Sequence, residues 1–259
     1  LRPDMAVVFG NSHDALNAAI CASLSDIPLA HIQGGESGYR NWDLSHGYGI
    51  TKLSHLHFAA TPGYRDQIIA FGEHPDRVFN VGSLMEEQLA QSRPKGDSAF
   101  RSIAGIDPKE PFILVAFDAD PDMGSRVRSQ AEQLIEALSD PRFRSYRILF
   151  QKSEDKGLGK MINQTIQDGC MARPRQCTAL PDLSVTDTGA LVRQAAAVVG
   201  NSSILFSLAA PLARPAVNIG SRQKDRERPA NIVDCGCDVS AIIQATERAL
   251  SVEFTDELK

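Results

Sequence analysis

The chain has 259 residues, of which 42% are hydrophobic and 23% charged, a composition typical of globular proteins. Its formal net charge is −5 at pH 7, which argues against nucleic acid or an anionic membrane as the main partner. No apolar run is long enough to span a membrane, and no signal-peptide pattern opens the chain. The five cysteines match no zinc spacing and favour reduced thiols in a cytoplasmic protein.

Apolar runs typical of strands alternate with helix-like segments along the first part of the chain. The runs at 5–9, 29–32, 57–60 and 78–81 are predicted strands. The segments 14–24, 49–55 and 62–71 are predicted helices, the last because Pro62 suits a first helical position. The polar stretch 91–97 reads as a linker, and we expect two domains, 1–93 and 94–259.

The same alternation continues beyond the linker. Strands are predicted at 112–117, 146–150, 178–180, 197–199 and 216–219. Helices are predicted at 127–138, 156–166, 191–196, 204–210 and 241–250, followed by a polar tail. Alternating strands and helices indicate an α/β protein with parallel sheets, in which ligands bind beyond the carboxyl ends of the strands. We therefore expect two Rossmann-like lobes.

The clearest local motif is Gly200-Asn201-Ser202-Ser203, where a strand ends and a helix is expected to begin. Free backbone amides at such a turn attract anions, and two hydroxyl groups would add donors to a phosphate. The alternative is that Asn201 or Ser202 only caps the helix.

A second motif follows the strand at 216–219, where four cationic residues occur between positions 222 and 228. Arg222 leaves the strand end first and could bind a phosphate or carboxylate with its planar fork of donors. The alternative is a solvated loop in which Lys224 and Arg228 pair with Asp225 and Glu227.

Glu36 follows a buried strand and two glycines, so it could act as a general acid or base, or be a plain surface glutamate. His55 and His57 invite a metal interpretation. No third ligand is evident, so we interpret them as structural histidines and expect no metal and no cofactor. All six histidines lie at or before position 74, so imidazole chemistry would come from the first lobe.

The runs HIQGGE, ITKLSHLHF, PDRVFNVGS, GNSS and PAVNIGSRQKDRE resemble the UDP-N-acetylglucosamine 2-epimerases, and the hydrolysing, sialic-acid-pathway branch best. The resemblance implies a GT-B-like architecture, a nucleotide-sugar substrate bound by the C-terminal lobe, and a homo-oligomer. It also implies elimination of UDP from UDP-N-acetylglucosamine, followed by hydration to N-acetylmannosamine. Family members begin with additional strand–helix units, so the first lobe is expected to be truncated here.

Carried over residue by residue, the resemblance places Glu36 and Asp43 among the catalytic positions. It places Ser202, Ser203 and Arg222 at the nucleotide diphosphate. His46 lies beside altered family positions, and we hypothesise that it pairs with Glu36 to replace the acid–base set.

Several family positions hold other residues in this chain. The first-lobe aspartate and arginine are replaced by Asn11 and Ser12, and a second-lobe histidine by Asp118. The remaining substitutions are Leu44, Gly47, Tyr48 and Leu208. Because such groups act as a unit in catalysis, three readings stay open. They are a divergent epimerase, an inactive nucleotide-sugar-binding or interaction subunit, and, more remotely, a glycosyltransferase on the same architecture.

Overall fold

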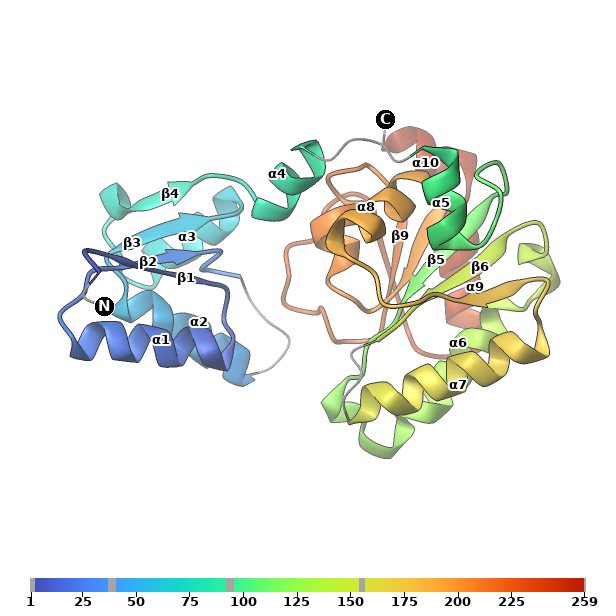
Figure 1. Cartoon of the computed structure of the whole chain (residues 1–259), viewed down its shortest axis with the longest axis horizontal. Helices are drawn as coiled ribbons and strands as arrows, with labels where there is room; N and C mark the ends of the chain where they lie inside the picture. Colours follow the sequence, from blue (N-terminus) through green and yellow to red (C-terminus); the bar gives the residue numbers. More distant parts are fainter. Residues whose placement is uncertain (1–2, 37–40, 92–95, 154–156, 259) are drawn as a thin grey trace. The chain divides into compact units, whose positions relative to one another are not determined.

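The structure is a computed structural model that describes residues 3–36, 41–91, 96–153 and 157–258. Internal contacts divide the chain into two compact units. Unit 1 comprises Leu1–Glu87 with Lys224–Glu227, and unit 2 comprises Gln88–Gln223 with Arg228–Lys259. Each unit has its own parallel sheet (Figure 1). The boundary expected at 93–94 lies outside the described residues and stays a prediction.

Unit 1 is built on a four-stranded parallel sheet in the order β1-β2-β3-β4. Its strands are β1 (Ala6–Phe9), β2 (Leu29–Ile32), β3 (Leu56–Ala59) and β4 (Val78–Asn80). The connections contain α1 (His13–Leu24), α2 (Asn41–Leu53), α3 (Pro62–Ala70) and the 3₁₀ turn η1 (Pro75–Arg77), and α4 (Leu84–Gln91) follows β4. Ser12 caps α1 and Thr61 caps α3, each accepting a backbone hydrogen bond with its side chain.

The two faces of this sheet differ in what covers them. Val8 and Leu29 pack against the alanine face of α1 and Ile50 of α2, and Ala59 and Val78 pack against α3. Figure 1 shows α1 and α2 beneath the strands. The register places Val7, Phe9 and Phe79 on the opposite face, where they are exposed by 59%, 52% and 43%. We call this second set the open apolar face.

Unit 2 contains a six-stranded parallel sheet in the order β10-β9-β8-β5-β6-β7. Its strands are β5 (Phe112–Ala116), β6 (Arg147–Gln151), β7 (Cys177–Ala179), β8 (Ala197–Gly200), β9 (Ala216–Ile219) and β10 (Ile232–Cys235). The chain runs from β5 to β7 on one side and returns to β8 on the other, so the strand order reverses between β5 and β8. In open α/β sheets such a switch point is the usual ligand site.

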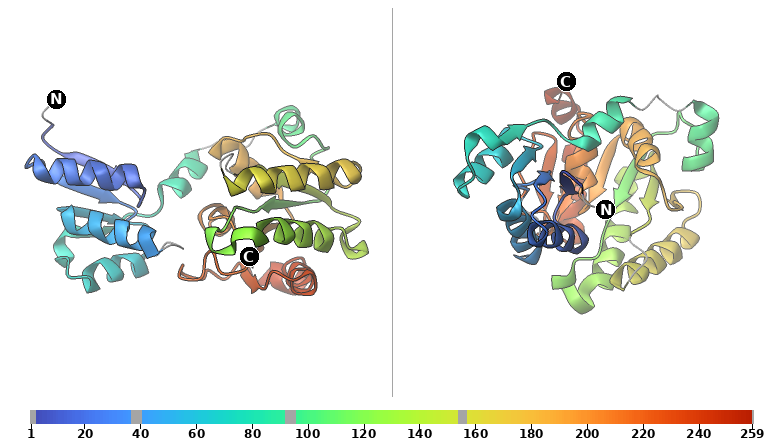
Figure 2. Two further views of the ribbon diagram at one scale, coloured as in Figure 1. Left: turned by 90° about the horizontal axis from the view of Figure 1, so that it is seen from below. Right: turned by 60° about the vertical axis from the view of Figure 1, so that its left-hand side comes forward.

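Helices cover both faces of the second sheet. They are α5 (Asp97–Ala104), α6 (Val127–Leu138), α7 (Leu158–Ala172), α8 (Val185–Gln194), α9 (Val239–Ala249) and α10 (Val252–Glu257). Short turns lie at η2 (Pro121–Arg126), η3 (Pro141–Phe143) and the π-helical η4 (Leu205–Ala209). Figure 2 shows α6, α7 and α9 along one face. On the other face, Phe100 of α5 meets Phe112 with ring centroids 5.8 Å apart.

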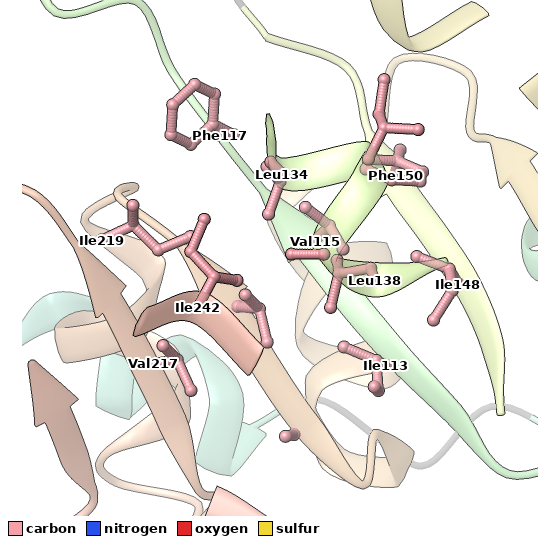
Figure 3. Close-up of a cluster of buried hydrophobic side chains, with 14 of the residues drawn as sticks. Ile113, Val115, Phe117, Leu134, Leu138, Ile148, Phe150, Val217, Ile219 and Ile242 are labelled. Atoms are coloured by element: carbon pink, nitrogen blue, oxygen red, sulfur yellow. The ribbon is translucent and has the colours of Figure 1, made fainter. Parts of the chain in front are cut away.

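The main core of unit 2 lies between the sheet and the α6–α7–α9 layer. Ile113 and Val115 of β5 and Ile148 and Phe150 of β6 project onto Leu134 and its neighbours (Figure 3). The strands are buried on both faces, and therefore they read in the sequence as continuous apolar runs without alternation. No helix among the described residues has the length and apolarity needed to cross a membrane.

The structure corrects several predicted elements. The expected linker is flanked by α4 and α5, and the expected polar tail contains α10. β10 was not predicted, because Ile232–Cys235 is short and only Val233 in it is fully buried. Three helices are longer than expected: α2 begins at Asn41, α7 continues to Ala172 and α8 begins at Val185. The sequence pattern does not reveal the additional helical turns, because tertiary packing, and not local apolar periodicity, decides where these helices begin and end.

Candidate functional site

The turn after β8 lies at the switch point of the unit 2 sheet. Gly200 has a φ of +149°, and a Cβ atom there would collide with the backbone oxygen of Ala116 on β5. Only glycine fits this close approach of two strands. Gly200 is therefore required for the fold itself, whatever ligand the turn receives.

Asn201 joins the ends of β5 and β8. Its Oδ1 atom accepts from the amide of Asp118 at 2.7 Å, and its Nδ2 atom donates to the carbonyl of Asp118 at 2.9 Å. The Asn201 side chain is fully buried. It thus bridges two strand ends and does not act as a helix cap, which corrects one alternative drawn from the sequence.

The backbone amides of this turn are less available than the sequence suggested. The amides of Asn201 and Ser202 both donate to the carbonyl of Ala116, at 3.1 and 3.2 Å. The hydroxyl groups of Ser202 and Ser203 form no hydrogen bond within the part of the chain that the structure describes. Any anion bound here would consequently be held by these hydroxyls and by side chains more than by a row of free amides.

Arg222 reaches over this turn from the end of β9. Its Nη1 atom donates to the carbonyl of Asn201 at 2.9 Å and lies 3.6 Å from Oδ2 of Asp118. Gln223 donates to the same carbonyl at 2.9 Å and is 4% exposed. The sequence candidates Ser202, Ser203 and Arg222 therefore gather at one edge of the sheet.

Asp118, which the sequence marked as a departure, is part of this group. Its carboxylate accepts from the hydroxyl of Ser153, which follows β6, at 3.1 Å and faces Arg222 on the other side. The side chains of Asp118 and Arg222 are 28% and 25% exposed. A carboxylate beside an anion site is unfavourable alone, and Arg222 supplies the compensating cation. Leu208 lies elsewhere, 1% exposed in the core, and offers no polar contact.

Glu36 lies in unit 1, at the end of the Gly34-Gly35 turn that follows β2. It accepts from Gln33 at 3.4 Å and forms an ion pair with Arg226 at 3.4 Å, the two side chains being 23% and 15% exposed. Burial and then the charge of Glu36 raise the pKa of nearby Tyr64 to about 12. The sequence identified Glu36 but not Arg226, because no local signal connects residues 190 positions apart.

The expected pair between His46 and Glu36 is not formed among the described residues. His46 instead contacts His13, with ring centroids 4.4 Å apart and planes at 70°. Its Nδ1 atom is buried without a hydrogen-bond partner within those residues. Asp43 lies on α2, but its side chain is outside what the structure describes, and Arg40 lies outside entirely.

His31, His55 and His57 contact different parts of unit 1. His55 accepts from the amide of Leu29 at 3.2 Å, and buried His57 lies 3.3 Å from Glu73. His31, also buried, bridges the carbonyl of Gly10 at 2.9 Å and the hydroxyl of Thr51 at 3.2 Å. Because a carbonyl only accepts, the proton of His31 resides on Nε2. These contacts hold strands and helices of unit 1 together.

Arg228 ties the cationic loop after β9 to other parts of unit 2. Arg228 pairs with Asp234 at 2.9 Å and donates to the carbonyl of Gln223, and it lies 5.4 Å from the centre of the Phe206 ring. The described residues contain no cluster of three or more His, Cys, Asp or Glu side chains able to hold a metal ion.

Two α/β units, each built on a parallel sheet, define the class of α/β proteins with Rossmann-like units, and in unit 2 two serines and an arginine lie at the switch point. A sequence profile described as UDP-N-acetylglucosamine 2-epimerase matches residues 1–258. The chain belongs to this family, which confirms the resemblance found in its sequence motifs.

Individual relatives agree with this assignment. The chain is 29% identical over 98% of its length to the GDP/UDP-N,N′-diacetylbacillosamine 2-epimerase (hydrolyzing) of Campylobacter jejuni, covering 65% of that protein. It is 30% identical over 97% of its length to polysialic acid biosynthesis protein P7 of Escherichia coli, covering 63% of it. The chain thus spans a little under two thirds of the length of these relatives.

A solved structure confirms the fold class. The UDP-GlcNAc 2-epimerase of Neisseria meningitidis, bound to UDP-GlcNAc, matches with a TM-score of 0.81 at 15% identity. The match covers 99% of this chain and 71% of the other. The expected GT-B-like class of two Rossmann-like lobes with parallel sheets is therefore confirmed.

Proposed function

We propose that this chain provides the nucleotide-sugar chemistry of a hydrolysing UDP-sugar 2-epimerase. The observation that carries the proposal is the convergence of Ser202, Ser203 and Arg222 at the switch point of unit 2. Two hydroxyl donors and a guanidinium suit the diphosphate of a nucleotide sugar. UDP-N-acetylglucosamine is one candidate substrate, and UDP-N,N′-diacetylbacillosamine, named for the Campylobacter jejuni relative, is the other.

In the proposed reaction a base removes the proton from C2 of the sugar while the bond between C1 and the phosphate oxygen breaks. UDP leaves with its negative charge, and Arg222 and the serine hydroxyls stabilise that charge. Water then adds to C1 of the unsaturated sugar, and a proton returns to C2 on the opposite face. The products are UDP and the sugar epimerised at C2.

Unit 1 supplies the proposed acid–base residues Glu36, Asp43 and His46. Glu36 is held in place by its ion pair with Arg226. We assign His46 the exchange of a proton with the sugar; its ring contacts His13, and its buried Nδ1 atom has no hydrogen-bond partner among the described residues. By family resemblance we also propose that the working protein is a homo-oligomer in the cytoplasm.

The second candidate is an inactive protein that binds a nucleotide sugar. Two residues favour it. The carboxylate of Asp118 forms an ion pair with Arg222, and Asn11 cannot act as a base. Both candidates require the nucleotide to bind at unit 2, and they differ only in turnover.

Calorimetry with UDP, combined with NMR detection of products from both candidate substrates, tests these candidates. Arg222→Gln is expected to weaken UDP binding, whereas Arg248→Gln, on α9, serves as the matched control. Binding with sugar release supports the epimerase, and Glu36→Gln should then abolish release. Binding without release supports the inactive protein. Absence of UDP binding by the folded chain contradicts both candidates.

A further inference from the structure

A polar cavity lies in unit 2, at the end of the sheet opposite the Gly-Asn-Ser-Ser turn. Its volume is ≈ 340 Å³, within the range of small-molecule sites. The residues that matter here are Glu110, Arg144, Tyr146, Arg147, Arg175 and Gln176. They precede or open β5, β6 and β7, so the cavity lies at the amino ends of these strands.

The sheet register explains why these residues meet. The amide of Arg147 donates to the carbonyl of Pro111 at 2.9 Å, and the amide of Ile148 donates to that of Gln176 at 2.8 Å. The turns that enter the three strands are thereby held side by side. Arg144 ends the short η3 turn, and Arg175 lies in the turn between α7 and β7.

The charges of the cavity do not cancel. Arg147 is held by Glu110 at 3.5 Å and donates to the hydroxyl of Thr178 at 3.1 Å. The charges of Arg147 and Glu110 therefore cancel each other. Within the described part of the chain, neither Arg144 nor Arg175 forms an ion pair, and both are exposed. Two guanidinium charges thus face the cavity without a carboxylate to balance them.

We propose that this cavity binds a small organic phosphate, with the phosphoryl group held by Arg144 and Arg175. A phosphomonoester carries nearly two negative charges at neutral pH, which matches the two unbalanced arginines. Guanidinium groups bind phosphate oxygens with parallel hydrogen bonds. Tyr146, which is partly buried against the core, offers a ring surface to the organic part, and Gln176 offers an amide.

This site is separate from the proposed nucleotide site and goes beyond the proposed function. β5 has five residues, so at about 3.3 Å per residue its two ends are roughly 15 Å apart. A phosphate at the amino ends of the strands therefore neither touches nor replaces a ligand at Ser202 and Arg222. The phosphate would be a second ligand of unit 2, in addition to the nucleotide.

Calorimetric titration with inorganic phosphate and with glucose 6-phosphate tests the proposal. We expect one mole of glucose 6-phosphate per chain to bind, more tightly than inorganic phosphate. Removing both arginines in Arg144→Gln/Arg175→Gln should lower the affinity by about tenfold or more, because two charged hydrogen-bonding groups are lost. Both side chains are exposed, and an unchanged melting temperature verifies that the variant is folded.

Two controls separate this cavity from other cationic surfaces. Arg128→Gln removes an exposed arginine of α6 and should leave the affinity unchanged. Arg222→Gln should also leave it unchanged, which distinguishes this site from the nucleotide site whether or not UDP binds. The proposal is overturned if wild-type protein binds neither phosphate, if the double variant binds as the wild type does, or if Arg222→Gln abolishes binding.

Discussion

The guanidinium of Arg222 faces the carboxylate of Asp118, with Nη1 and Oδ2 3.6 Å apart at the carboxyl edge of the unit 2 sheet. The two residues come from loops after β9 and β5, and both contact Asn201. Asp118 therefore competes with any phosphate for the same cation. This competition is the most direct structural consequence of the aspartate at this position.

Replacing Asp118 with asparagine should tighten UDP binding about two- to fivefold, because a partly exposed ion pair of modest strength no longer opposes the phosphate. Calorimetry on the Asp118→Asn variant measures the change. Asp140→Asn, which breaks another ion pair of unit 2, should leave UDP affinity as it is. Weaker UDP binding by Asp118→Asn would mean that Asp118 supports the ligand and does not compete with it.

Gly200→Ala should destabilise unit 2 by about 3 kcal/mol or more, because the new Cβ would overlap the Ala116 carbonyl in a backbone conformation that alanine avoids. Gly105→Ala is the matched control, since Gly105 has a φ of +68° but open space around it. It should cost only about 1 kcal/mol. Urea unfolding of the two variants compares them, and equal losses would contradict the steric argument.

Stability should fall as the pH drops from about 6.5 towards 4. Burial lowers the pKa of His31 from 6.5 to about 4, so the folded chain keeps this histidine neutral while the unfolded chain protonates it. The unfolded state then binds more protons in that window, and stability decreases by up to about 3 kcal/mol. Above pH 6.5 His31 causes no such loss of stability.

Buried His57 should add to this dependence, because burial lowers its pKa too. Unfolding followed by circular dichroism at several pH values measures the slope. His31→Gln, which retains an amide donor towards Gly10, should flatten the curve. An identical slope in His31→Gln would show that other groups cause the loss.

The open apolar face of unit 1 should bind hydrophobic dyes. Phe9→Lys/Phe79→Lys places charges on that face, and we expect lower dye fluorescence with a change in stability within about 0.5 kcal/mol per site, since both residues are exposed. Val8→Lys, on the helix-covered face of the same strand, should instead destabilise strongly. Unchanged dye fluorescence in the double lysine variant would show that this face is covered in solution.

The sequence predicted most strands because they are buried apolar runs, and β2, α6 and β9 have the expected bounds. It also placed Ser202, Ser203 and Arg222 after the correct strands. It could not predict the partners of these residues. Asp118 and Arg222 are distant in sequence, and the switch point that brings them together depends on strand order, which periodicity does not encode.

The acid–base candidates were harder to predict for a similar reason. Proximity in sequence suggested that His46 pairs with Glu36, whereas the fold gives these residues His13 and Arg226 as partners. Arg226 was visible only as one cation of a basic loop. The pairing of side chains from different helices, strands and loops follows from tertiary packing, and a single sequence does not specify it.

Two hydrogen bonds between the Asn201 side chain and the backbone of Asp118 join the ends of β5 and β8. A ligand arriving at this edge cannot wedge the two strands apart without breaking both bonds. Adjustment is left to the side chains of Asp118 and Arg222, which are partly exposed. Recognition in unit 2 would then depend on how these two side chains reorient, while the strand ends that carry them stay in place.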